Sequence, residues 1–356
     1  MTVKNLNIFR GRRVFITGHT GFKGSWLAFL MHEIGAEVMG YALPPETSVN
    51  HFDLLNLSNK INHIKGDIKE SNNLLKILKD FQPEFVFHLA AQSLVRESYE
   101  NPLETFKTNI FGSINLLDSV RQTKSIRSLV YITSDKCYEN VEWIWGYREN
   151  DRLGGRDPYS ASKASAEIVF SSYLRSFFDY TNSLGAATAR AGNVIGGGDW
   201  ATDRIIPDCI RSIEKGHPII LRNPKATRPW QHVLEPLSGY ILLAKNLYDH
   251  PKKFSGSWNF GPSTNYVQTV LQIVESIFNQ IGKGSIQISE STKEAYEANL
   301  LQLNCDKSHQ LLNWYPRWNI DKTLNAIVVW YKAYMNNENI EDITRNQIYD
   351  YFPELK

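Results

Sequence analysis

The sequence has few cysteines, no long apolar run and almost no net charge, and each absence excludes a class of protein. Its 356 residues contain only Cys137, Cys209 and Cys305, which are widely spaced and include no CxxC pair. An odd number of distant cysteines builds neither a disulfide framework nor a zinc site. We therefore expect reduced thiols with structural roles, and no bound metal.

The apolar segments are short. None approaches the roughly 18 residues that a membrane-spanning helix needs, and residues 1–5 lead into no apolar run of the kind found in a signal peptide. We therefore expect a cytoplasmic protein that does not act at a membrane. The formal net charge of +2 also argues against a nucleic-acid partner.

Short β-branched runs alternate with longer amphipathic ones between residues 13 and 190. This alternation is typical of βαβ units that feed a parallel sheet, so we expect an α/β fold with a doubly wound, Rossmann-type sheet. The apolar periodicity predicts helices that face the sheet. We expect strands at 13–17, 37–41, 85–89 and 128–133, and helices at 22–34, 101–122 and 158–178.

The alternation breaks after Asn193, where a glycine run at 196–198 and several prolines follow. We predict that residues 1–190 form a dinucleotide-binding domain and that the chain returns to it at 233–260, with a helix at 233–247 and a strand at 257–260. Residues 191–232 and 261–356 are then a smaller mixed α/β domain for the substrate. From Met335 onward the chain is polar and acidic, so we expect a loosely held tail.

Three glycines follow the first expected strand and open the first expected helix: Gly18, Gly21 and Gly24. Glycines there let the backbone and the helix N-terminus approach a pyrophosphate, because no Cβ atom intervenes. The order strand, loop, helix makes a dinucleotide site far more specific than glycines alone would. His19 and Lys23 are open to a second interpretation as exposed loop residues, and His88 as a packed strand histidine.

Tyr159 and Lys163 lie four residues apart, directly after an expected helix start at Asp157 and Pro158. They therefore share one helix face. A phenol with a pKa of about 10 is a poor base at neutral pH, and we expect the neighbouring ammonium to lower that pKa. Ser134, Asp135 and Lys136 follow the expected strand at 128–133. They therefore lie at the sheet edge where parallel α/β folds bind ligands.

The GxxGxxG spacing resembles that of the extended short-chain dehydrogenase/reductase family. The Ser134-Asp135-Lys136 triplet is similar to the Ser/Thr-Asp-Glu triplet of the nucleotide-sugar 4,6-dehydratases in that family, with lysine in place of glutamate. The resemblance extends through most of the chain. It is carried by residues 18–26, 143–150, 190–200 and 228–233.

The resemblance implies NAD as the cofactor. The second strand ends at 41–44 without the acidic residue that usually binds the adenosine ribose, and no arginine is present there for a 2′-phosphate; we favour NAD over NADP. The residues expected to bind it are Gly18, His19, Gly21, Phe22, Lys23, Gly24, Asp67, Ile68, Leu89, Ala90, Ala91, Thr108, Thr133, Tyr159 and Lys163.

The resemblance also implies roles in catalysis. Tyr159 takes the proton of the sugar C4 hydroxyl while NAD accepts the C4 hydride, and Ser134 holds the same oxygen. Asp135, kept protonated, is the acid that helps the C6 hydroxyl leave. Lys136 is the base for the C5 proton, which requires a neutral amine. Lys163 completes the catalytic set, and the cofactor ends as it began.

The implied substrate is CDP-D-glucose, converted to CDP-4-keto-6-deoxy-D-glucose for deoxysugars of surface polysaccharide such as O-antigen. The residues expected to bind it are Gln92, Asn193, Arg204 and Arg228, and Arg222 is equally well interpreted as a surface charge. We expect a homodimer or homotetramer that pairs the helices at 101–122 and 158–178. Two other functions stay open: a nucleotide-sugar 4-epimerase of the same family, and a non-catalytic NAD(H)-sensing regulator.

Overall fold

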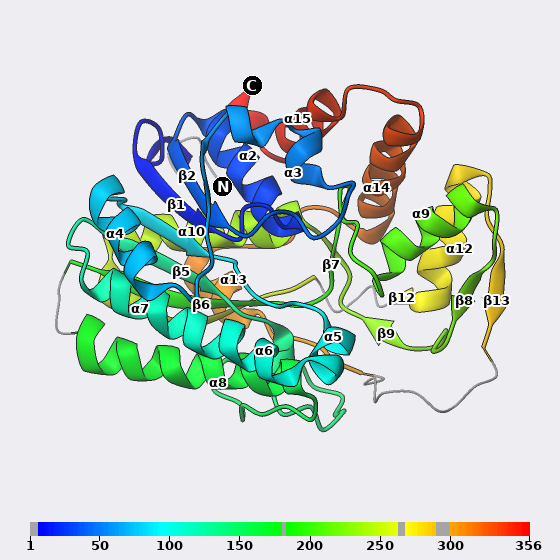
Figure 1. Ribbon diagram of the computed structural model, residues 1–356. Coiled ribbons are helices and arrows are strands. Elements are labelled where there is room, and N and C mark those ends of the chain that lie inside the picture. The colour runs from blue at the N-terminus through cyan, green and yellow to red at the C-terminus, as the bar shows by residue number, and fades with distance from the viewer. Residues whose placement is uncertain (1–5, 180–182, 263–267, 290–299) are drawn as a thin grey trace.

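The protein is built around a seven-stranded sheet whose strands are all parallel, in the order β11-β6-β5-β4-β1-β2-β3. The computed structural model describes residues 6–179, 183–262, 268–289 and 300–356. Helices cover both faces of the sheet (Figure 1). This is the doubly wound Rossmann-type fold that the sequence predicts. The strands are β1 Arg13–Thr17, β2 Glu37–Ala42, β3 Asn62–Lys65, β4 Phe85–His88, β5 Ser128–Ile132, β6 Gly185–Ala191 and β11 Gly256–Phe260.

The direction in which the sheet grows reverses beside β1, because β2 lies on one side of it and β4 on the other. The loops at the carboxyl ends of β1 and β4 diverge at such a reversal and leave room for a ligand. The glycine loop follows β1, and residues 89–92 follow β4. The topology thus brings both predicted cofactor segments to the same edge.

The main helices begin and end close to their expected positions. They are α2 Phe22–Ile34, α3 His51–Leu54, α4 Ser71–Phe81, α5 Val95–Glu100, α6 Pro102–Phe106, α7 Ser113–Arg121, α8 Pro158–Tyr173, α9 Ile205–Lys215, α10 Leu234–Asp249, α11 Pro251–Phe254, α12 Val270–Ile281, α13 Asp306–Leu312, α14 Ile320–Met335 and α15 Ile340–Tyr351. Short 3₁₀ turns are η1 Leu57–Asn59, η3 Asp135–Cys137 and η5 Pro353–Leu355.

The expected helix at 101–122 is not regular: a π-helical stretch, η2 Lys107–Gly112, separates α6 from α7. A Cβ atom on Gly112 would lie 2.6 Å from Ile68 Cδ1, so glycine lets this stretch approach the loop after β3. Helix α8 likewise ends in a π-helical turn, η4 Leu174–Phe178. Such irregular turns are frequent at functional sites, and apolar periodicity does not reveal them.

The chain returns to the sheet after residue 233, as α10 and β11 show, so the expected helix and strand there are confirmed. Outside the main sheet lie three short strand pairs, and two of them surround α9 and α12 at the right of Figure 1. The pairs are β7 Val194–Ile195 with β10 Gln231–His232, β8 Ile219–Leu221 with β13 Ile286–Ile288, and β9 Thr227–Arg228 with β12 Gln268–Thr269. The exact domain division stays a prediction.

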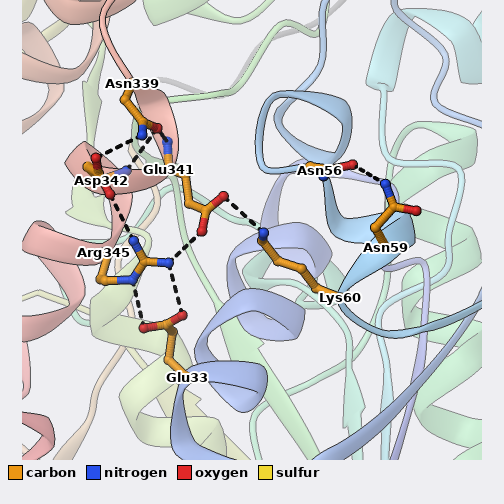
Figure 2. A network of polar contacts seen from close by, with 8 residues as sticks. All are labelled: Glu33, Asn56, Asn59, Lys60, Asn339, Glu341, Asp342 and Arg345. Atoms are coloured by element: carbon orange, nitrogen blue, oxygen red, sulfur yellow. Dashed lines mark hydrogen bonds and ion pairs between the residues drawn. The ribbon is translucent and has the colours of Figure 1, made fainter.

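The expectation of a loosely held C-terminal tail is wrong. Helix α15 packs onto the first domain, and Tyr351 and Phe352 at its end are buried. Its polar residues make specific contacts: the Arg345 guanidinium binds Glu33 of α2 at 2.9 Å. Glu341 accepts from Arg345 and binds Lys60 at 3.0 Å (Figure 2). Composition suggested a tail because one face of this amphipathic helix is charged.

Candidate active site

The glycine loop between β1 and α2 is closed tightly enough that two of its glycines are required. Gly18 has φ +74°, and a Cβ there would lie 2.6 Å from the backbone nitrogen of Ala90. A Cβ on Gly24 would lie 2.0 Å from the Gly18 carbonyl oxygen. Gly21 caps α2 without a side-chain hydrogen bond, so the helix N-terminus keeps the bare N–H groups that bind an anion.

The three other predicted residues of this loop are not exposed: His19 is buried, and Phe22 and Lys23 are half-buried. His19 is fully buried: its Nε2 lies 2.7 Å from His63 Nδ1, and its ring packs where a Cβ on Gly40 would stand. Burial and the His63 charge lower the pKa of His19 to about 3. Lys23 is half-buried, and burial, Arg204 and Lys163 lower its pKa to about 8. The interpretation of both as exposed loop residues is therefore wrong.

The segment after β4 is tied to its surroundings by backbone contacts. The Ala90 N–H donates to Thr17 Oγ1 at 3.2 Å, and Asn109 of η2 exchanges two 2.9 Å hydrogen bonds with the Gln92 backbone. Leu89 and Ala91 are half-buried beside them. The Gln92 side chain turns back onto the Leu94 backbone. His88 is a packed strand residue, 2.7 Å from Thr17 Oγ1 and stacked on Tyr131.

Asp67 and Ile68 follow β3, and Thr108 comes from η2, which approaches this loop. Ile68 is buried against Gly112. Asp67 is half-buried and accepts from the Lys69 N–H at 2.9 Å. Thr108 is half-buried in η2, adjacent in sequence to Asn109.

Ser134 and Tyr159 meet at the carboxyl end of β5, where Ser134 lies close enough to the Tyr159 hydroxyl to act on its pKa. Asp157 caps α8 by accepting from the Ser160 N–H at 2.9 Å, which starts the helix one residue before Tyr159. Lys163 Nζ lies 6.0 Å from the centre of the Tyr159 ring. Burial lowers the pKa of Lys163 to about 8.

The pKa of Tyr159 differs from the expected direction. Burial raises it to about 12, although Ser134 and the Arg204 charge act to lower it. The expected lowering by the neighbouring lysine is not observed as a net effect, since desolvation of a buried phenolate outweighs the surrounding cations.

Asp135 is an unusual carboxyl group. It is 3% exposed, and its Oδ1 accepts from Ser134 Oγ at 3.0 Å. Its Oδ2 is buried and has no hydrogen-bond partner among the residues that the structure describes. Burial raises the pKa of Asp135, partly offset by Lys136 and Arg228. A buried carboxyl group in this setting favours the protonated form and retains a free oxygen for a ligand. Lys136 is half-buried beside it.

The predicted substrate residues come from several elements. Arg204 binds Asp199 at 3.0 Å, which raises the arginine pKa, and donates to Ser93 Oγ at 3.1 Å. Arg228 acts electrostatically on Asp135 and donates to the Thr227 carbonyl at 2.8 Å. Arg204 likewise influences Lys23 and Tyr159, so the structure gathers these charges near the reacting group.

Asn193 and Arg222 are less closely tied to that group. Asn193 is half-buried, and its backbone carbonyl accepts from the Gln231 N–H at 3.1 Å. Arg222 lies 3.8 Å from the carboxylate of Asp203. The position of Arg222 in an ion pair is compatible with either interpretation of this residue.

Four residues that sequence reasoning missed hold the site together: Asn109, Glu167, Arg190 and Asp199. All four are buried and make hydrogen bonds to the predicted residues or to their neighbours. Glu167 carried a signal, because it continues the four-residue spacing of Tyr159 and Lys163. Arg190 and Asp199 lie in the segment 190–200 that carries the resemblance, although no role was assigned to them. Asn109 is a single polar residue without a motif.

No group of three or more histidine, cysteine or acidic side chains placed to hold a metal ion occurs in the described part of the chain. No helix within residues 6–179, 183–262, 268–289 and 300–356 is both long and apolar enough to cross a bilayer.

Comparison with known proteins agrees with this geometry. The family described as GDP-mannose 4,6 dehydratase matches residues 15–327. CDP-glucose 4,6-dehydratase of Salmonella typhimurium is 48% identical over 349 residues, 97% of each chain. The structure of dTDP-glucose 4,6-dehydratase from Bacillus anthracis in complex with NAD superposes with a TM-score of 0.77 at 21% identity, over 92% of this chain and 98% of that one.

An epimerase shares the fold as well. Mth375 of Methanothermobacter thermautotrophicus gives a TM-score of 0.79 at 20% identity, over 94% of this chain and 96% of that one. The fold therefore does not separate dehydratases from epimerases. The family match and the 48% identity distinguish the two classes. On these grounds the chain belongs to the nucleotide-sugar 4,6-dehydratases of the extended short-chain dehydrogenase/reductase family.

Proposed function

We propose that the protein removes water from CDP-D-glucose to form CDP-4-keto-6-deoxy-D-glucose, with NAD bound at the glycine loop. The observation that carries the proposal is the buried Asp135 carboxyl group, which is hydrogen-bonded to Ser134 and close enough to Tyr159 to influence its pKa. A dehydratase needs such an acid to expel the C6 hydroxyl, whereas a 4-epimerase does not. The identity of the nucleotide base rests on the Salmonella relative.

The residues of the glycine loop fit NAD. Gly18 and Gly24 leave the space that a Cβ would fill, and α2 begins without a side-chain cap. The cofactor-binding set predicted from the sequence is retained in this proposal, with Lys163 at the nicotinamide end. When bound, NAD supplies the hydride acceptor for C4 and afterwards the hydride donor for C6.

Tyr159 accepts the C4 hydroxyl proton, and Ser134 orients the same oxygen. Because burial raises the pKa of Tyr159 to about 12, the phenolate has to be stabilised before it can accept the proton. Ser134 and the Arg204 charge act in that direction, and we assign the same role to the Lys163 ammonium once substrate and cofactor close the site.

Asp135 donates the proton that leaves with the C6 hydroxyl as water. Its raised pKa keeps the group protonated to a higher pH than an ordinary aspartic acid. Lys136 removes the C5 proton that the C4 ketone has acidified, and it returns a proton to C5 when C6 is reduced. Its side chain follows Asp135 directly, so the acid and the base stand next to each other at the end of β5.

Arg204 and Arg228 bind the substrate pyrophosphate, with Gln92 and Asn193 as polar neighbours. Arg204 is suited to this role because Asp199 and Ser93 fix its guanidinium. Fixed guanidinium groups recognise phosphate oxygens with defined geometry. We further propose a cytoplasmic homodimer or homotetramer that supplies deoxysugar precursors for surface polysaccharide.

Mass spectrometry of the purified protein with CDP-, dTDP-, UDP- and GDP-linked glucose tests the proposal, with GDP-mannose as an additional sugar. We expect loss of one water from CDP-glucose alone. Loss from another nucleotide sugar instead would correct the base. An isomer of unchanged mass would establish a 4-epimerase. Tyr159→Phe is the control, since it should bind NAD without forming product.

A further inference from the structure

Glu167 continues the catalytic face of α8. It lies four residues after Lys163 and eight after Tyr159, and all three side chains are buried. Residues at this spacing follow one another along a single helix face. A buried carboxylate one turn from the catalytic lysine has no part in the chemistry proposed above, so its position requires another explanation.

The Glu167 carboxylate binds the residue that follows β5 and two residues of the neighbouring strand β6. It accepts from Thr133 Oγ1 at 2.5 Å and from Thr188 Oγ1 at 2.9 Å. Arg190 binds it with two hydrogen bonds, from Nε at 2.8 Å and from Nη2 at 2.7 Å. Thr133 directly precedes Ser134. Glu167 therefore connects the helix that carries Tyr159 to the strand that carries Ser134.

Arg190 extends the connection to the far end of the Ser134-Asp135-Lys136 segment. Its Nη1 donates to the Tyr138 hydroxyl at 2.7 Å and to the Glu149 carbonyl at 2.9 Å. Tyr138 in turn donates to Asn259 Oδ1 of β11 at 2.8 Å. The segment is thus held on both sides, through Thr133 before it and Tyr138 after it, by one ion pair.

We propose that Glu167 and Arg190 are a positioning pair that keeps Ser134 and the Tyr159–Lys163 helix in register for proton transfer, and that the Glu167 charge keeps Lys163 protonated. This inference rests on the proposed function. The pair is almost completely enclosed, with side chains 1% and 2% exposed. Buried ion pairs seldom add net stability compared with apolar residues, which favours a role in geometry.

The charges around Lys163 support the electrostatic part. Glu167 raises the lysine pKa against the effect of burial. From other elements, the Lys23 ammonium of α2 and the His88 ring of β4 face the same group. His88 is neutral at ordinary pH because burial lowers its pKa to about 3. At Lys163, the negative charge of Glu167 therefore opposes the positive charge of Lys23.

The titration of Lys163 tests the charge, and it needs no substrate. The rate at which acetic anhydride labels Lys163 is measured against pH by peptide mass spectrometry, in the wild-type protein and in Glu167→Gln. We expect the midpoint to move to lower pH by about 0.5 to 1 unit. Glu167→Asp, which keeps the carboxylate, should restore most of the shift. An unchanged midpoint in folded Glu167→Gln would overturn the electrostatic role.

Glu235→Gln is the matched control. Glu235 is also a buried glutamate with several hydrogen bonds, from Arg317 N, Trp318 N and Tyr351 Oη. These hydrogen bonds connect Glu235 to the C-terminal segment, and none of them involves a residue of α8. We expect this variant to lose stability while the Lys163 midpoint stays unchanged.

Tyr138→Phe tests the positioning and covers the case in which Glu167→Gln does not fold. It removes only the hydroxyl between Arg190 and Asn259. With saturating NAD and CDP-glucose, we expect C4 hydride transfer to slow by about 10-fold or more, with KM and the Lys163 midpoint unchanged. A wild-type rate would overturn the positioning role. If the wild-type protein converts no nucleotide sugar, the proposed function fails, while the Lys163 titration still decides the charge.

Discussion

At the scale of single residues, Asp135 has the most to reveal, because its buried carboxyl group combines a raised pKa with an unpartnered oxygen. We expect Asp135→Asn to oxidise C4 but to lose water about 100-fold or more slowly, since the amide has no proton to donate. Stopped-flow absorbance of reduced nicotinamide, with mass spectrometry of the sugar, separates the two steps. Lys136→Met should also stop after oxidation, and wild-type turnover in either variant would contradict its assigned role.

Asp135→Asn should also stabilise the folded protein. A carboxyl group whose pKa is raised by folding contributes its stability below the unfolded pKa of about 3.9. That contribution is lost as pH rises through the folded pKa. Asp135→Asn does not titrate, so its advantage over the wild type should grow with pH to about 1 to 2 kcal/mol near neutrality. Urea unfolding at pH 4 and pH 7.5 measures it, and equal differences at both pH values would count against this account.

At the scale of the element, the glycines of the strand–loop–helix unit differ in how much room each would leave for a Cβ atom. A Cβ on Gly24 meets backbone at 2.0 Å, whereas one on Gly21 makes an ordinary contact at 3.4 Å. We expect Gly24→Ala to destabilise the protein by about 1 to 3 kcal/mol more than Gly21→Ala does. Thermal unfolding of the two variants without cofactor compares them directly, and equal losses would mean that the loop is looser than described.

At the scale of the whole molecule, α15 closes the fold by binding the N-terminal part of the chain (Figure 2). Burial raises the pKa of Glu341, but hydrogen bonds from Lys60 and Arg345 outweigh that effect, so the pKa lies below its ordinary value. The contribution of Glu341 is therefore present at neutral pH and lost as the pH falls through its lowered pKa. We expect Arg345→Met to cost about 1 kcal/mol at pH 7 in low salt, and less in 1 M salt.

A double-mutant cycle of Arg345→Met with Glu33→Gln isolates that interaction. The reference is Lys322→Met, which removes an exposed ion pair with Asp350 and should change stability by less than about 0.5 kcal/mol. A coupling energy near zero between Arg345 and Glu33 would show that α15 is held by its apolar face alone.

Local sequence patterns were enough to predict the features of this protein that depend on residues close together in the chain. Alternating apolar periods specified the parallel sheet, and the glycine spacing, the Tyr159–Lys163 pair and the Ser134–Lys136 triplet specified the kind of chemistry, because each is a short motif on a recognisable element. The irregular helix that runs from α6 through η2 to α7 also lies where the sequence predicts a helix, at 101–122. Only its π-helical turn, which depends on the fit of Gly112 against Ile68, was not visible.

The tertiary structure decided what depends on residues far apart in the chain. It buried His19 against His63, raised the Tyr159 pKa instead of lowering it, and packed the polar C-terminal residues into α15. It also brought Glu167 and Arg190 together beneath the catalytic segment. Burial and pairing arise only when distant elements pack, so no local pattern contains them, and these effects set the charge state of the site.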